Sequence, residues 1–183
     1  KKVVLNKGSN VHYLLVKALE NAGLKYSDVE TVFLAPADAR AAFERGSVDA
    51  WVIWDPFLAA AETSIGAKVL KDGTNTVNNH QFYLAEESYA SKRADIVAII
   101  FEELKKVNDW AISKPKEVAN ALAPLTGLDV VTLEKALSRG GYGINYLNNN
   151  VITEQQKIAD TFYDLKLIPK KIDIKSVVWL PEQ

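Results

Sequence analysis

The sequence predicts an α/β fold with a parallel-rich sheet flanked by helices. Short apolar runs alternate with amphipathic segments in the first third of the chain, with short connections, and the later part is mostly helical in pattern. Strands that alternate with helices pair in parallel, because each helix carries the chain back across the sheet. Since the strands come early and the helices late, we expect two layers with different packing partners.

The first strand–helix unit contains the most informative turn. A strand over residues 2–5 leads through Gly8, Ser9 and Asn10 into an amphipathic helix over residues 11–22, beginning at Val11. The first turn of such a helix presents free backbone N–H groups and the positive end of the helix dipole, so it predicts an anion site. Helix capping is the structural alternative for Ser9 and Asn10.

Two further units repeat the pattern. A strand over residues 32–34 leads to a helix over residues 39–45, and a strand over residues 50–53 leads to a helix over residues 57–62. In parallel sheets, ligands bind beyond the carboxyl ends of the strands. Polar or aromatic side chains follow all three predicted strands, and we expect them to converge at one edge: Ser9, Asn10, Asp38, Trp54 and Asp55.

Trp54 and Asp55 end the third of these strands. Alternation places Trp51 on one face of the sheet and Trp54 on the other. Trp54 comes last, where it offers a ligand apolar area and one N–H donor, with core packing as the alternative. Asp55 before Pro56 is typical of a helix start, so its first expected role is to cap that helix.

His12 and Arg139 complete the candidate set. His12, in the first turn of its helix, could donate to an anion, and a core histidine is the alternative. Arg139 precedes a glycine-rich turn and could contact the anion or simply end its helix. The chain has no nucleophile elbow, and its two histidines lack metal-ligand spacing. We therefore expect no catalytic residue, metal or cofactor.

The rest of the chain predicts one more strand and then helices. The strand is expected over residues 81–85, after a polar stretch over residues 71–79. A last extended piece is expected over residues 172–179. Four helices are expected between these, over residues 94–112, 115–122, 130–137 and 153–165.

Composition excludes several classes of protein. The chain has 183 residues, 48% of them hydrophobic, and a net charge of -1, so it can bury a core and is a poor match for nucleic acid. No apolar run approaches the ~20 residues that span a membrane. Cysteine is absent, which excludes disulfides, thiolate metal sites and cysteine nucleophiles.

Residues 36–56, PADARAAFERGSVDAWVIWDP, closely resemble the aliphatic-sulfonate-binding proteins of bacterial ABC importers. Four other stretches are similar to the same family: residues 7–10 with His12, 82–85, 159–163 and 167–171. The resemblance covers essentially the whole chain. Taurine- and nitrate-binding relatives share much of this framework, so the ligand stays open among small oxyanions.

The resemblance implies a periplasmic-binding-protein type II fold, in which two α/β lobes joined by hinge strands close on a ligand. Residues 1–110 would be the second lobe, and residues 111–183 a C-terminal helical segment returning to a first lobe whose N-terminal part is missing here. The late helices would then expose apolar faces, which could drive dimerisation.

The resemblance also implies a function. The protein would capture an alkanesulfonate outside the cytoplasm, in the periplasm, and deliver it to an ABC transporter permease in the membrane without turnover; a membrane anchor on a longer form stays open. We expect the ligand at Gly8, Ser9, Asn10, Val11, His12, Trp54, Asp55 and Arg139. The rival is an enzyme like the pyrimidine-synthesising relatives of thiamin metabolism, which would need a catalytic histidine or cysteine. The chain has no cysteine and only His12 and His80.

Overall fold

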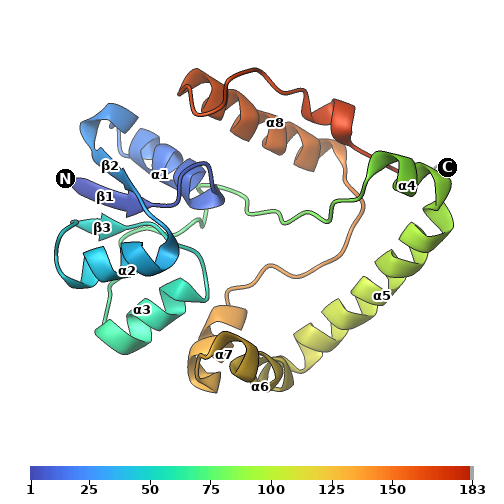
Figure 1. The fold of residues 1–183 in the computed structure, drawn as a ribbon, viewed down its shortest axis with the longest axis horizontal. Coiled ribbons are helices and arrows are strands. Elements are labelled where there is room, and N and C mark those ends of the chain that lie inside the picture. The colour runs from blue at the N-terminus through green and yellow to red at the C-terminus, as the bar shows by residue number, and fades with distance from the viewer. Residues whose placement is uncertain (182–183) are drawn as a thin grey trace.

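The sheet lies in the N-terminal part of the computed structural model, which describes residues 1–181 (Figure 1). β1 (Lys2–Leu5) is its central strand, and β2 (Glu30–Phe33) and β3 (Ala50–Trp51) pair with it in parallel on either side. The predicted parallel α/β arrangement is therefore confirmed, with a third strand shorter than the sequence predicts.

Three helices follow these strands, one after each strand. They are α1 (Asn10–Asn21), α2 (Pro36–Glu44) and α3 (Phe57–Ile65). α2 begins three residues earlier than predicted because Pro36, which lacks a backbone N–H, fits the first helical position, where that group has no intrahelical partner. We call residues 2–66, which include these strands and helices, the sheet region.

The sheet region has its own core. Alternation along β1 directs Val3 and Leu5 into a cluster with α1, whereas Val4 packs into a second cluster with α2. Trp51 packs against the second cluster and Trp54 against the first, so the predicted division of these two side chains is confirmed. Both faces of the sheet are therefore covered by helices from the same stretch of chain.

The later part of the described chain is helical, and we call residues 87–177 the helical region. Its helices are α4 (Glu87–Lys92), α5 (Ala94–Ser113), α6 (Pro115–Thr126), α7 (Val130–Leu137) and α8 (Asn149–Asp164). Two short 3-10 helices also occur, η1 (Tyr26–Asp28) in the sheet region and η2 (Ile174–Val177) near the end. α7 packs against α3 and α8 against α1, so the helical region returns twice to the sheet region (Figure 1).

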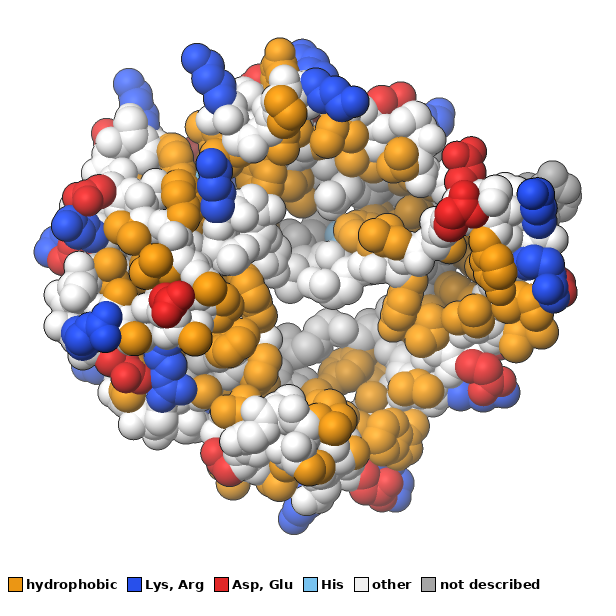
Figure 2. Space-filling model, viewed as in Figure 1, with side chains coloured by type: hydrophobic (Ala, Val, Ile, Leu, Met, Phe, Trp, Pro, Cys, Tyr) orange, Lys and Arg blue, Asp and Glu red, His pale blue; other side chains and the backbone are white. Residues whose placement is uncertain are grey.

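An opening separates much of the helical region from the sheet region (Figure 2). α5 runs along the far side of the molecule, and none of its residues is buried. Its predicted apolar face exists, but Ile99 is 57% exposed and Ile100 and Val107 are exposed as well. Within residues 1–181, this face has no partner that buries it.

The predicted strand over residues 81–85 is wrong. The segment crosses the middle of the molecule without joining the sheet, and Leu84 is 92% exposed. A run of apolar and aromatic side chains after a polar, turn-rich stretch led to the prediction. A strand also needs a neighbour for its backbone groups, and none lies beside this segment in the described sheet.

Local side-chain hydrogen bonds explain the other differences. Asp173 accepts from the Lys175 N–H at 3.0 Å, so η2 replaces the middle of the extended piece predicted over residues 172–179. Glu86 accepts from the Tyr89 N–H at 2.8 Å and caps α4, which the sequence did not predict. Asn148 caps α8 in the same way, so that helix starts at Asn149 instead of residue 153.

Candidate functional site

The turn before α1 leaves the start of the helix without a side-chain cap. Ser9 is the N-cap residue by position, and its carbonyl accepts from the N–H groups of His12 and Tyr13 at 3.0 and 3.3 Å. Its hydroxyl instead donates to the Asn6 carbonyl at 2.7 Å. The Ser9 side chain therefore holds the turn together and does not use up a helix N–H group.

The Asn10 side chain also forms hydrogen bonds within the protein. Its Oδ1 accepts from the Val11 N–H at 2.9 Å, and its Nδ2 donates to Oδ1 of Asn79 at 3.0 Å. The Gly8 N–H donates to the ring of His12. Among the described residues, the backbone N–H groups of Ser9 and Asn10 have no protein acceptor. They are half-exposed and exposed residues, so both N–H groups are available to an anion.

His12 lies under this turn in the core. Its side chain is 0% exposed, and both ring nitrogens hydrogen bond within the protein. Burial lowers the pKa of His12, and the nearby charge of Lys7 lowers it further. His12 is thus a core histidine, as the alternative interpretation of the sequence expected. Its contact with a ligand stays a prediction, and the buried ring exposes no atom to a ligand.

Trp54 lies on the same side of the sheet as the α1 turn. It is half-buried and packs against the cluster that contains Leu5 and Val11. Phe57 meets it edge to face, with ring centroids 6.2 Å apart. Two of the three strand ends that the sequence singled out are thus brought together by one hydrophobic cluster.

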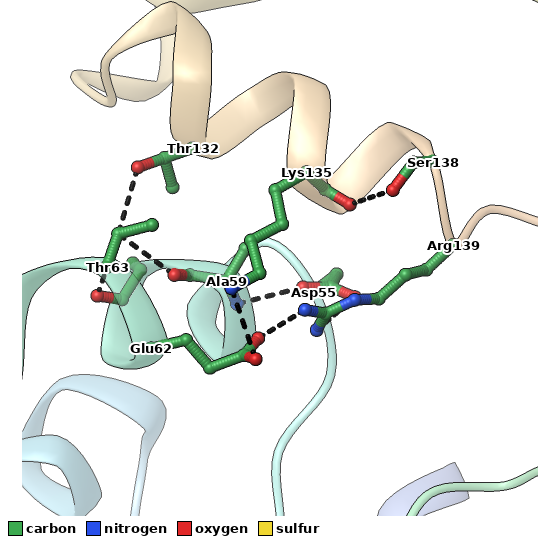
Figure 3. Close-up of polar contacts among 9 residues, drawn as sticks. Asp55, Ala59, Glu62, Thr63, Thr132, Lys135, Ser138 and Arg139 are labelled. Atoms are coloured by element: carbon green, nitrogen blue, oxygen red, sulfur yellow. Dashed lines mark hydrogen bonds and ion pairs between the residues drawn. The ribbon is translucent and has the colours of Figure 1, made fainter. Parts of the chain in front are cut away.

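Asp55 and Arg139 belong to a cluster of charges between α3 and the end of α7 (Figure 3). Asp55 accepts from the Ala59 N–H at 2.9 Å, so the expected contact with the first turn of α3 is present. Arg139 pairs with Glu62 and lies 3.7 Å from Asp55, while Lys135 lies 3.2 Å from Glu62. Burial raises the pKa of Asp55, although the Ala59 N–H and Arg139 both favour its charged form.

Sequence reasoning missed two residues at the turn. Lys7 extends over the ring of Phe33 at the end of β2, 5.5 Å from its centroid, and brings a positive charge to the turn. Asn79 reaches Asn10 from the polar stretch after α3. Nothing in a polar loop of this kind predicts which amide will contact the turn. Asp38 is exposed in the first turn of α2, and no hydrogen bond joins it to this site in the described chain.

Other features lie away from this turn. A hollow of about 410 Å³ lies among α5, α6 and α7. No cluster of three or more potential metal ligands occurs within residues 1–181. In the same part of the chain, no helix combines the length and apolar character needed to cross a membrane.

Residues 3–123 match the sequence profile of the NMT1-like family. The crystal structure of the periplasmic aliphatic sulphonate binding protein SsuA from Escherichia coli superimposes with a TM-score of 0.93 at 40% identity, over 100% of this chain and 59% of that one. The alkanesulfonate-binding protein SsuA from Xanthomonas axonopodis pv. citri, bound to MOPS, gives 0.89 at 33% identity, over 98% and 62%.

A taurine-binding periplasmic protein of Escherichia coli K12 is 28% identical in an alignment that covers 87% of this chain and 50% of that protein. The expected fold and the resemblance are confirmed by these matches, and the relatives are named as binding proteins rather than enzymes. This chain spans 57% of the length of the first curated relative, an Escherichia coli protein named for binding aliphatic sulfonates.

Proposed function

We infer the function of this chain from its family: it belongs to the NMT1-like family. We propose that it is part of an extracytoplasmic protein that captures aliphatic sulfonates and delivers them unchanged to an ABC transporter permease. The observation that carries the proposal is the uncapped start of α1 beside Trp54, in a chain similar along its whole length to sulfonate-binding proteins.

The turn offers donors that suit a sulfonate. A sulfonate spreads one negative charge over three oxygens, and removing it from water is costly unless those oxygens gain donors. The N–H groups of Ser9 and Asn10 would supply them, and the dipole of α1 adds about 0.3–1 kcal/mol. Neutral donors bind an anion without the strong hold of a fixed charge pair, which suits a protein that must release its ligand.

Trp54 would contact the carbon portion of the ligand. Its ring is half-buried beside the turn, and an aromatic face there excludes water from an alkyl chain. The relative bound to MOPS, itself an alkanesulfonate, supports a ligand that carries a sulfonate group on an organic chain. Arg139 lies 3.7 Å from Asp55 and pairs with Glu62. We therefore propose that Arg139 and Asp55 hold α7 against α3 rather than bind the anion.

We further propose that residues 1–110 form one lobe and that residues 111–183 belong with a second lobe outside this stretch of sequence. The exposed apolar face of α5 and the greater length of the relatives support a further packing partner. A second copy of the chain is the other arrangement that would cover this face. Another small oxyanion, such as taurine or nitrate, is the second candidate ligand, and the taurine-binding relative favours taurine.

Calorimetric titration of the natural protein that contains these 183 residues tests the proposal. Ethanesulfonate should bind more tightly than taurine, nitrate or sulfate. Trp54→Ala should weaken ethanesulfonate binding about ten-fold, which corresponds to about 1.4 kcal/mol. Ser9→Ala should weaken it severalfold, because the Asn6 carbonyl loses the hydroxyl that holds the turn.

Trp110→Ala is the matched control, because Trp110 is exposed on α5, away from the turn. It should leave the affinity unchanged. Unchanged affinity in both Trp54→Ala and Ser9→Ala would disprove the assigned site. If no alkanesulfonate binds at all, the family relationship describes the fold of this protein but not its ligand.

A further inference from the structure

A chain of hydrogen bonds joins the anion turn to the sheet through His12. The Gly8 N–H donates to Nδ1 of His12 at 3.1 Å, and Nε2 lies 2.7 Å from the Tyr26 hydroxyl. That hydroxyl donates to Oγ1 of Thr31 on β2 at 3.3 Å. This series of hydrogen bonds therefore begins at the turn and ends on β2 of the sheet.

The direction of every bond in this chain is determined by one donor. A backbone N–H can only donate, so Nδ1 of His12 must be unprotonated where it meets Gly8. The single ring proton is then on Nε2, where it is donated to the Tyr26 oxygen. The hydroxyl proton of Tyr26 is left to donate to Thr31, as the geometry has it.

Gly8 is the residue whose conformation this bond holds. Its φ is +74°, in the left-handed region, and it stands directly before Ser9 and Asn10. Gly8 is exposed, so no packing fixes it from outside. The bond to a fully buried ring therefore ties the turn to the core of the sheet region.

We propose that His12, as the neutral tautomer with its proton on Nε2, is a positioning residue for the anion turn and does not itself touch the ligand. Its Nδ1 holds Gly8 so that the N–H groups of Ser9 and Asn10 point outward. This inference rests on the proposed function, since it gives His12 a role in sulfonate binding.

The groups around His12 disfavour its charged form. Lys7 in the turn is the charged group that acts on it, and the other neighbours are neutral, from η1, β2 and α8: Tyr26, Thr31, Phe33 and Phe162. Protonation would bury a positive charge beside Lys7 and set Nδ1–H against the Gly8 N–H. The turn would then lose its bond to the core.

The change of ligand affinity in acid therefore distinguishes a positioning role of His12 from direct contact between His12 and the anion. A sulfonate stays ionised throughout the range in which histidine titrates, so only the protein changes charge. If His12 positions the turn, affinity is constant above the ordinary histidine pKa of 6.5 and falls once the pH drops below the lowered pKa of His12. If His12 binds the anion directly, its protonation adds attraction, and affinity rises in acid.

The test is calorimetric titration of ethanesulfonate into the natural protein between about pH 8 and pH 5. The wild type should lose affinity about ten-fold per pH unit below the pKa of His12. His12→Asn places an amide oxygen near Nδ1 and cannot titrate, so it should bind with little dependence on pH. His12→Phe lacks an acceptor for the Gly8 N–H and should bind ethanesulfonate weakly at every pH. Because His12→Phe can fail to fold, the wild type is compared chiefly with His12→Asn.

A ligand-free measurement completes the test. Nitrogen-15 NMR of the two histidines should show His12 protonated on Nε2 alone, with exposed His80 as the internal reference. An Nδ1-protonated ring, affinity that rises in acid, or the wild-type pH dependence retained in His12→Asn would each overturn the inference. Absence of ethanesulfonate binding at every pH would overturn the proposed function and this ligand role with it. Constant affinity across the pH range in which the nitrogen-15 signals show His12 becoming protonated would overturn the inference alone.

Discussion

The sheet region and the helix α5 are built from similar amphipathic segments, but only the sheet region buries its apolar side chains. In the sheet region, two hydrophobic clusters cover both faces of the sheet with helices from the same stretch of chain. In the helical region, the long helix α5 (Ala94–Ser113) buries none of its residues. The difference teaches that an apolar stripe predicts a helix but does not say which surface will cover it.

Truncation of one apolar side chain in each region should give the largest difference in stability between the two regions. Leu5→Ala removes a side chain that is 0% exposed in the central strand, so unfolding free energy should fall by about 2–5 kcal/mol. Ile99→Ala on α5 removes an exposed side chain, and the change should stay within about 0.5 kcal/mol. Urea unfolding of this chain measures both.

The comparison of Leu5→Ala with Ile99→Ala also tests whether α5 has a packing partner in solution. A loss from Ile99→Ala as large as that from Leu5→Ala would mean that α5 is covered in solution. Sedimentation at two protein concentrations would then show whether a second copy covers it.

Two glycines at opposite ends of α1 narrow the comparison to a single helix. Gly8 and Gly23 have φ values of +74° and +73°, and a Cβ at either would meet nothing within 4 Å. Alanine at either position should therefore cost about 1 kcal/mol of stability through the backbone alone. Gly8→Ala should also weaken ethanesulfonate binding, whereas Gly23→Ala should not; equal affinities would show that the turn does not hold the ligand.

The smallest expected effect comes from the charges that join the two regions. Glu62→Gln weakens the contacts of α3 with Lys135 and Arg139 and should reduce stability by about 0.5 kcal/mol, since the group is partly exposed. Burial raises the pKa of Glu62, but hydrogen bonds from both cations outweigh it, so the pKa lies below its ordinary value.

A lowered carboxylate pKa gives this contribution a definite pH dependence. It is fully present above the ordinary value of 4.5 and is lost as the pH falls through the lowered pKa of Glu62. The stability difference between wild type and Glu62→Gln should therefore shrink in acid. A difference that persists well below that pKa would mean that the pair does not tether the regions electrostatically.

The sequence predicts the sheet region well because its interactions are local. Each strand is followed by its own covering helix, so hydrophobic spacing and turn residues carry most of the information. The failures lie where the structure depends on a partner or a local side-chain bond. Residues 81–85 form an apolar and aromatic run typical of a strand but have no neighbouring strand, and Asp173 produces a 3-10 turn that periodicity does not detect.

The candidate site is predicted in part. Ser9, Asn10 and Trp54 stand at strand ends, and that position could be read from the sequence. The partnership of Arg139 with Glu62 joins residues far apart in the chain, so spacing could not reveal it. The same holds for Asn79 and for the aromatic neighbours of His12 that come from β2 and α8.

The packing of α8 (Asn149–Asp164) on α1 has a consequence for how the protein forms. Phe162 closes the pocket around His12 from about 150 residues further along the chain, whereas Tyr26 and Phe33 lie nearby in sequence. During synthesis the sheet region can therefore fold while α8 is still unmade, because its own contacts are short-range. The ring of His12 then remains open to water on one side until α8 has been synthesised and packs on α1.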